Sequence, residues 1–273
     1  MTATTAPGHR AARAVVDTGV LIRRNLLTNV RLPDVLILST LQPTVFVLMF
    51  LYVFGGAIQA ALPAAAHGEY VYWLIPGILA QSAVFGAAPT AFGLNTDRTS
   101  GILDRLRALP TARSTVLFGR TLADLARNAV IVGLQLAVGI LLGFRWHTTT
   151  GLCAALAVTL AFGYACSWVM AYLGLAIASS EAIQAAVYIV VFPLTMTSSV
   201  FLPTQTMPGW LQTFAQHQPI TVVANTVRAL MLGPGALPAG HSLGGELLTS
   251  LAWSAAIVAV FAPLTVRAYA RLG

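Results

Sequence analysis

The chain contains 273 residues, of which 57% are hydrophobic and only 8% are charged. Soluble globular domains carry about 25% charged residues, so this composition excludes a soluble domain and indicates a membrane protein. All 15 Lys and Arg positions are arginine, so the sequence lacks the lysine-containing phosphate loop of ATP-hydrolysing pumps. We attribute the formal net charge of +7 to membrane topology and contact with anionic lipids, and we expect no nucleic-acid partner.

The first expected element is an amphipathic helix over residues 10–32. Val16, Val20 and Leu27 lie on one broad apolar face of this helix, and most of its arginines gather on another. Such a helix is expected to lie in the plane of the cytoplasmic headgroups and to end at Pro33, before the first membrane span. A simple topology anchor is the alternative interpretation of this segment.

Six apolar stretches have about the 20-residue length that crosses a bilayer. These expected spans cover residues 35–56, 71–94, 121–143, 152–178, 182–202 and 247–266. Asp124 and Arg127 occupy the first turns of the third span, and we expect both side chains at the membrane interface. The sequence therefore predicts an all-α membrane protein with six transmembrane helices.

The distribution of arginines predicts the orientation of these spans. Arginines concentrate before the first span, between the second and third spans, and after the last, whereas only Arg145 and Arg228 fall on the opposite side. Cytoplasmic loops retain positive charge. Both termini are therefore expected to be cytoplasmic. The abundance of alanine and arginine without lysine suggests a bacterial genome, and hence a bacterial cytoplasmic membrane.

A short amphipathic helix is expected over residues 97–110, DRTSGILDRLRALP. Asp97, Thr99 or Ser100 could cap its start, and Pro110 would stop it. One face of the helix carries Ile102, Leu103, Leu106 and Leu109, and the remainder carries Asp104, Arg105 and Arg107. A helix this short is marginal alone, so it must pack on the bases of the spans or on another protein. A solvated topology loop is the alternative.

Residues 203–235, between the fifth and sixth spans, are too apolar for a free loop. Prolines divide this extracellular segment into pieces that are too short to cross the membrane: Pro203, Pro208, Pro219 and Pro234. We expect short re-entrant helices that dip into the outer leaflet, with Trp210 at the interface. Together they would form a lid over whatever the spans enclose.

Polar side chains also occur inside the expected spans. Candidates for lining a substrate pathway are Gln42, Gln81, Ser82, Gln135, Tyr164, Gln184, Thr195 and Ser198. Interhelical hydrogen bonding, worth about 0.6 kcal/mol on average, is the alternative explanation for each of them. An interior with so few charges favours an amphipathic or lipid-like cargo.

The sequence offers little enzyme chemistry. GHSLG, residues 240–244, has the spacing of a nucleophile elbow around Ser242, but it follows GPGALPA where the elbow requires a strand. No metal-binding spacing of histidines is present, so we expect no metal site. No carboxylate is expected in the middle of a span, which disfavours ion-driven transport. Energy for uphill transport would therefore have to come from a partner protein.

Two motifs resemble those of the type-2 ABC exporter permeases, especially the daunorubicin-resistance-like membrane subunits. The pattern G-x-L-[ED]-R-L-x-x-x-P is represented by Gly101, Leu103, Asp104, Arg105, Leu106 and Pro110. A second pattern is represented by Phe201, Pro203, Met207, Pro208, Trp210 and Leu211, followed by Pro219, Thr221, Arg228, Ala229 and Leu230. The likeness covers essentially the whole chain, residues 1–273, as one ABC-2 type transmembrane domain. One departure is Asn225, where relatives often carry an acidic residue three positions before the arginine.

The resemblance implies a permease subunit that exports a hydrophobic or amphipathic compound, such as a drug, an antibiotic or a lipid-like molecule. Its coupling helix would dock into a separate ATPase subunit through Gly101, Ile102, Leu103, Asp104, Arg105, Leu106, Arg107, Leu109 and Pro110. Its extracellular gate would comprise Phe201, Pro203, Met207, Pro208, Trp210 and Arg228. Two permease chains, identical or homologous, would work with two ATPase chains that bind ATP and Mg, and this chain would carry no catalytic residue and no cofactor. The alternatives are an intramembrane hydrolase that uses Ser242 and a membrane anchor that holds an ATPase without transporting.

Overall fold

The computed structural model describes residues 33–59, 62, 69–101, 113–238 and 240–271. Within these ranges the chain is a bundle of helices without strands, so the all-α prediction is confirmed there. The predicted interfacial helix over residues 10–32 lies outside the described residues. So does the predicted coupling helix after Gly101.

Five helical stretches of the described chain are long and apolar enough to cross a membrane. They are Thr40–Gln59, Tyr70–Thr99, Arg120–Leu141, Thr149–Ala176 and Leu243–Arg271. They correspond to the first four and the last of the predicted spans. The fifth predicted span is represented by α9 (Ser180–Met196), an apolar helix of 17 residues. The chain is thus a multi-pass membrane protein.

The first two stretches are not continuous α-helices. The first consists of α2 (Pro33–Met49), the π-helical η1 (Phe50–Phe54) and α3 (Gly55–Gln59). The second consists of α4 (Tyr70–Phe85) and α5 (Ala88–Thr99), which are separated by a turn. Proline causes part of this break, because Pro89 has no backbone N–H to donate to the carbonyl of Phe85.

The remaining helices are α7 (Arg113–Leu141), α8 (Thr149–Ala176), α9, α10 (Gly209–His217), α11 (Pro219–Leu232) and α12 (Leu243–Arg271). Local sequence fixes several of their starts. The Thr148 hydroxyl accepts the amide of Gly151 at the start of α8, and the Ser179 hydroxyl accepts that of Ala182 at the start of α9. The short helices α10 and α11 begin directly after a proline and at one, respectively.

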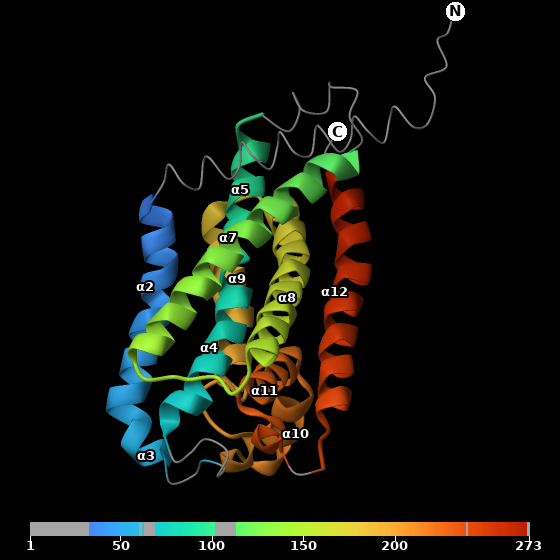
Figure 1. Cartoon of the computed structure of the whole chain (residues 1–273). Coiled ribbons are helices and arrows are strands. Elements are labelled where there is room, and N and C mark those ends of the chain that lie inside the picture. The colour runs from blue at the N-terminus through green and yellow to red at the C-terminus, as the bar shows by residue number, and fades with distance from the viewer. Residues whose placement is uncertain (1–32, 60–61, 63–68, 102–112, 239, 272–273) are drawn as a thin grey trace, which may run out of the picture.

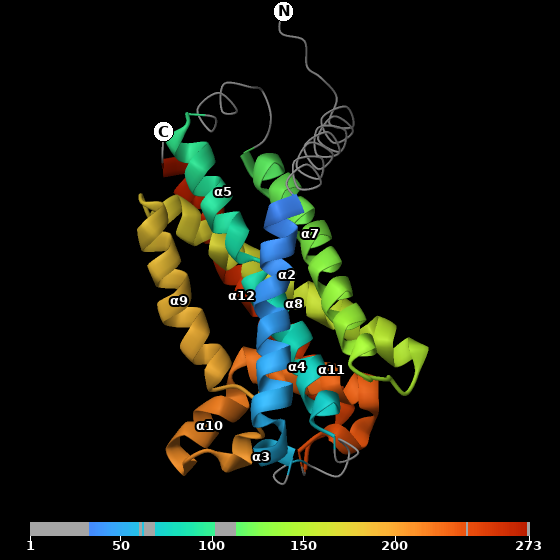
Figure 2. The same ribbon diagram turned by 90° about the vertical axis from the view of Figure 1, so that its left-hand side faces the viewer.

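The helices run between two ends of the bundle. The beginning of α2 and the ends of α5 and α12 lie at one end, whereas α3, α10 and α11 lie at the other (Figure 1). Figure 2 shows α9 extending from the α5 end toward α10. Contacts with α4, α5, α7, α11 and α12 make α8 a central helix.

The structure contradicts one predicted boundary. A helix start at residue 97 is wrong, because α5 continues through Thr99 and includes Asp97 in its last turn. Ser100 and Gly101 then form a turn, with Gly101 at φ +69°, in the left-handed region that favours glycine. Tertiary contacts override the capping pattern, since Asp97 pairs with Arg120 of α7 instead of capping a new helix.

Candidate functional site

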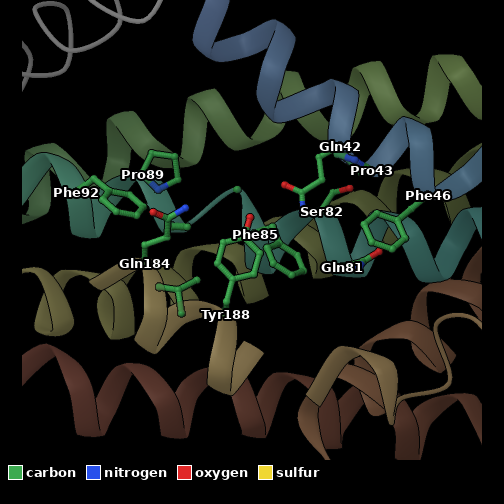
Figure 3. A pocket seen from close by; sticks show the side chains of 13 residues that line it. Gln42, Pro43, Phe46, Gln81, Ser82, Phe85, Pro89, Phe92, Gln184 and Tyr188 are labelled. Carbon is green, nitrogen blue, oxygen red and sulfur yellow. The ribbon is translucent and has the colours of Figure 1, made fainter. Parts of the chain in front are cut away.

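A cavity of about 180 Å³ opens between α2, α4, α5 and α9 (Figure 3). It borders the break between α4 and α5, so that Gly86, Ala88 and Pro89 contribute to its wall. Because the chain changes direction at the break, both α4 and α5 contribute residues to the cavity wall.

Four of the eight predicted pathway residues line this cavity: Gln42, Gln81, Ser82 and Gln184. Gln81 and Ser82 are only 3% and 2% exposed, and neither the Oε1 atom of Gln81 nor the Ser82 hydroxyl has a hydrogen-bond partner in the described chain. Buried polar atoms without partners are costly in native proteins. These two groups are therefore available to a bound molecule or to water.

The other four predicted pathway residues lie elsewhere. Gln135 donates through Nε2 to the carbonyl of Thr40 at 2.9 Å, which joins α7 to α2. Tyr164 packs edge-on against Trp168. Thr195 and Ser198 donate their hydroxyls to backbone carbonyls three or four residues earlier. For these four the alternative explanation, hydrogen bonding and packing among helices, accounts for their positions.

The rest of the cavity wall is aromatic and apolar. Phe46, Phe85, Phe92 and Tyr188 supply rings from all four helices. The thirteen residues that line the cavity include no charged side chain. Such a wall suits a largely apolar molecule that carries a few hydrogen-bonding groups.

Phe201, a predicted gate residue, connects this cavity with the end of the bundle that holds α10. Its ring is stacked on Phe50 of the π-helical segment, with centroids 4.1 Å apart. It also lies 6.0 Å from the ring of Phe46, which lines the cavity. The hydroxyl of Tyr70 donates to the Phe201 carbonyl at 2.7 Å and holds the backbone in place.

Arg228, a second predicted gate residue, is buried and joins α11 to α4. Its guanidinium donates to the carbonyls of Trp73 and Ser199 and to Oδ1 of Asn225. Asn225 also accepts the Ser199 hydroxyl at 2.8 Å. In the part of the chain that the structure describes, amide and carbonyl oxygens replace the carboxylate expected from the family pattern.

The other predicted gate residues divide by exposure. Pro203 is buried, Met207 is half-buried, and Pro208 is exposed. Trp210 is 78% exposed at the start of α10. The structure thus brings Phe201 and Arg228 to one buried region, through Ser199 and Val200, and leaves Trp210 on the surface.

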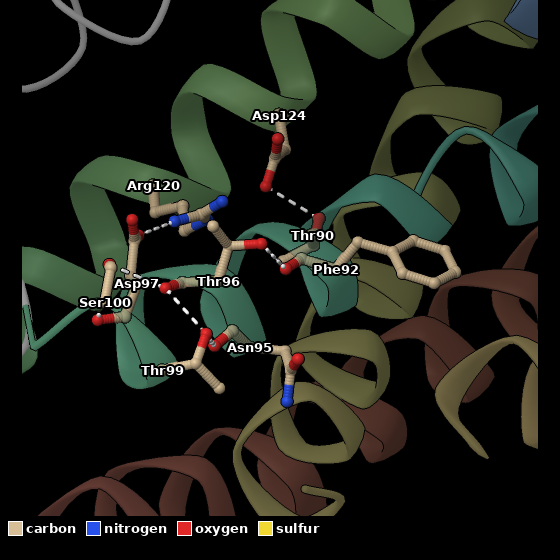
Figure 4. Close-up of polar contacts among 9 residues, drawn as sticks. All are labelled: Thr90, Phe92, Asn95, Thr96, Asp97, Thr99, Ser100, Arg120 and Asp124. Atoms are coloured by element: carbon tan, nitrogen blue, oxygen red, sulfur yellow. Dashed lines mark hydrogen bonds and ion pairs between the residues drawn. The ribbon is translucent and has the colours of Figure 1, made fainter. Parts of the chain in front are cut away.

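A buried polar contact that the sequence did not predict joins α5 to α7 (Figure 4). The hydroxyl of Thr90 donates to Asp124 at 2.6 Å, and Asp124 forms an ion pair with Arg127 at 3.0 Å. Asp124 and Arg127 lie in the first turns of the stretch Arg120–Leu141, and helix packing leaves them only 5% and 6% exposed. Their spacing of three residues on one helix face was the available signal.

Ser242 lies in a second cavity of about 500 Å³, near the start of α12, with His241 and Glu246. Its hydroxyl accepts the amide of Gly245 at 3.1 Å, as a helix cap does. His241 pairs with Glu246. No strand precedes Ser242 and no histidine hydrogen-bonds to it within the described residues, so the nucleophile-elbow interpretation gains no support.

Comparison with known proteins places this arrangement in a family. The family model described as ABC-2 type transporter matches residues 17–232. The chain is 36% identical to the daunorubicin resistance ABC transporter permease protein DrrB1 of Streptomyces coeruleorubidus, over 96% of this chain and 89% of the relative.

More distant relatives agree. The probable doxorubicin resistance ABC transporter permease protein DrrC of Mycobacterium tuberculosis is 26% identical over 95% of this chain and 91% of its own length. The putative transport permease ycf38 of Cyanophora paradoxa is also 26% identical, over 77% of this chain and 72% of its own. These relatives are transport permeases rather than enzymes. The chain therefore belongs to the ABC-2 type transporter family.

Proposed function

We propose that the chain exports an apolar, aromatic, drug-like compound across a bacterial cytoplasmic membrane. Family membership makes it the permease subunit of an ABC transporter. The names of two relatives, which refer to daunorubicin and doxorubicin resistance, support a cargo of this class. The observation that carries the proposal is the cavity, in which polar groups from three helices face an uncharged aromatic space.

The energy would come from separate ABC ATPase subunits, a partnership that the family implies. α5 lines the cavity through Pro89 and Phe92 and ends at Thr99, two residues before the motif that begins at Gly101. Gly101–Pro110 would dock on the ATPase, where ATP and Mg would bind. A displacement of this segment would then reach the cavity wall through a single helix.

We further propose the six-span arrangement, with α9 as the fifth span. At 1.5 Å per residue, its 17 residues extend about 26 Å, close to the roughly 30 Å of a hydrocarbon core. Both termini would be cytoplasmic, since the start of α2 and the end of α12 lie at the same end of the bundle as the end of α5 (Figure 1). The helices α10 and α11 would be the re-entrant elements of the outer leaflet.

A second permease chain would complete the pathway. The cavity of about 180 Å³ is smaller than the roughly 300–1,000 Å³ of sites for drug-sized ligands. Apolar side chains are exposed on the two helices that flank it, including Leu41 and Val45 of α2 and Ile189 and Val190 of α9. A second copy facing these helices would enlarge the site, and lipid would cover the remaining apolar surface. The working exporter would then contain two permeases and two ATPases.

The proposal is tested with inside-out membrane vesicles from native cells and from cells that lack this gene. Doxorubicin fluorescence reports uptake after ATP addition. Uptake that requires both ATP and the gene supports export, and restoring the gene with Ser242→Ala should restore uptake. Equal uptake in both vesicle types contradicts the proposal, and a membrane anchor without transport would give that result.

A further inference from the structure

Three buried polar residues of α7 hold the break between α4 and α5. Asp124, Arg127 and Asn128 are 5%, 6% and 1% exposed, and we call them the α7 staple. They lie beside the turn at Gly86 and Ala87, which borders the cavity.

Besides the Phe85 carbonyl, which lacks a donor because of Pro89, two further backbone carbonyls at the turn lose their helical donors. In an unbroken α-helix the amide of Ala87 would donate to Ala83, and that of Thr90 to Gly86. Here the Ala87 amide donates to the Val84 carbonyl at 3.2 Å, and the Thr90 amide donates to the Ala87 carbonyl at 3.0 Å. The carbonyls of Ala83 and Gly86 therefore need other donors in a buried environment.

The α7 staple supplies those donors. Asn128 donates through Nδ2 to the Ala83 carbonyl at 3.0 Å, and Arg127 donates through Nη2 to the Gly86 carbonyl at 3.2 Å. The approach is close enough to require glycine, because a Cβ atom on Gly86 would lie 2.3 Å from Oδ1 of Asn128. The staple thus replaces the helical donors of the Ala83 and Gly86 carbonyls.

Asp124 extends the staple to the first turn of α5. Its Oδ2 accepts the Thr90 hydroxyl at 2.6 Å (Figure 4). Its Oδ1 pairs with Arg127 at 3.0 Å. One ion pair of α7 is therefore bonded to both the turn and α5. Nε of Arg127 and Oδ1 of Asn128 have no partner in the described chain, which leaves capacity for a second hydrogen-bond arrangement.

The other end of α5 is also fixed to its neighbours. Asp97 forms an ion pair with Arg120 of α7 (Figure 4). Asn95 donates through Nδ2 to the carbonyls of Ile177 and Ala178, between α8 and α9, at 2.9 and 3.0 Å. α5 is thus held at both ends and carries cavity residues between them.

We propose that the α7 staple is a positioning element that transmits movement of α5 to the cavity. The staple fixes the angle between α4 and α5. A displacement of the cytoplasmic end of α5 therefore moves the cavity wall at the break, because the turn cannot absorb the movement by bending. This inference rests on the proposed function, in which the segment after α5 receives force from the ATPase.

The test compares transport with ATP hydrolysis in one preparation. The exporter is purified through a tag on this chain, together with its ATPase subunits, and reconstituted into liposomes. Asp124→Leu with Arg127→Met removes both charges at once, a replacement that often leaves stability unchanged or raised. We expect doxorubicin moved per ATP hydrolysed to fall at least about fivefold, the lower range of allosteric coupling, while ATP hydrolysis continues.

Thr265→Val is the matched control, because the Thr265 hydroxyl makes a buried contact between α12 and the Trp168 carbonyl of α8, away from the break. Its transport per ATP should equal that of the wild type. An unchanged ratio in the double variant overturns the inference. If the double variant does not fold, Thr90→Val is measured instead. This change removes one hydrogen bond of the staple and leaves the ion pair between Asp124 and Arg127 in place. An unchanged ratio of transport to ATP hydrolysis in Thr90→Val would also overturn the inference. Failure of the wild type to transport would instead refute the proposed function.

Discussion

The guanidinium of Arg228 lies 3.6 Å from the centre of the Trp73 ring, and the same arginine donates two hydrogen bonds to the Trp73 carbonyl. It also reaches Ser199 and Asn225. One buried side chain thus joins α4, α11 and the segment after α9. These contacts require a planar group with several donors in fixed directions. The ammonium group of lysine cannot make them all.

Arg228→Lys is therefore expected to destabilise the protein although it keeps the charge. Loss of these charge-assisted hydrogen bonds should lower the free energy of unfolding by about 2–3 kcal/mol. Unfolding in mild detergent, followed by circular dichroism, measures the change. Arg145→Lys is the control at an exposed arginine and should have little effect. Equal stability of the two variants would show that the contacts of Arg228 do not stabilise the fold.

Gln81→Leu is expected to weaken cargo binding and leave stability almost unchanged. Its Oε1 has no protein partner to lose, whereas one hydrogen bond to cargo contributes about 1 kcal/mol, or about fivefold in affinity. The half-saturating doxorubicin concentration for vesicle uptake should rise by that factor.

Gln135→Leu provides the contrast for this prediction, because Gln135 bonds to Thr40 and Thr44 of α2 and does not line the cavity. Its stability should fall by roughly 0.6–1.7 kcal/mol, with the half-saturating concentration unchanged. The reverse pattern in the two variants would place the binding site elsewhere.

Gly174→Ala is expected to disrupt the contact between α8 and α5. A Cβ atom at this position would lie 2.3 Å from the carbonyl oxygen of Ala91 and 2.9 Å from its Cα atom. Such overpacking typically costs about 1–3 kcal/mol, and the unfolding temperature should fall. Gly133→Ala in α7 is the control, because a Cβ atom at this position would have no neighbour within 4 Å. This substitution should leave the free energy of unfolding unchanged or raise it by up to about 1 kcal/mol. Equal tolerance of both alanines would contradict the close packing of α5 on α8.

The proposed orientation predicts which sites an external reagent can reach. In a variant without Cys153 and Cys166, a cysteine at Trp210 should react with a membrane-impermeant maleimide in intact cells. A cysteine at Arg271 should react only after permeabilisation. Both positions are exposed, but α10, which carries Trp210, and the end of α12, which carries Arg271, lie at opposite ends of the bundle (Figure 1). Labelling of Arg271→Cys from outside would reverse the topology.

Much of the fold could be predicted because hydrophobicity and length determine which segments can cross a bilayer. The helix ends were less accessible to prediction, because tertiary contacts compete with local capping. Asp97 is an example. Its sequence context predicts a helix cap, but its carboxylate forms an ion pair with Arg120 of the neighbouring helix α7.

The candidate site was predicted only in part, because a glutamine in an apolar span has the same appearance wherever it points. Gln81 and Gln135 occupy similar sequence contexts, but one lines the cavity and the other bonds to α2. Asp124 and Arg127 were assigned to the interface because isolated charges are costly inside a bilayer. Their contacts with Thr90 and with the Gly86 carbonyl could not be predicted, because the sequence does not identify the segment that packs against this face of α7.

Docking of an ATPase on the segment after α5 is tested by site-specific photo-crosslinking in native cells. A photoreactive amino acid replaces Leu106, and a second variant carries it at Leu248, an exposed residue at the start of α12. Mass spectrometry of the adducts should identify a polypeptide with a nucleotide-binding phosphate loop at Leu106 and not at Leu248. A folded Leu106 variant that yields no such adduct would contradict the proposal that a separate ATPase drives this permease through that segment.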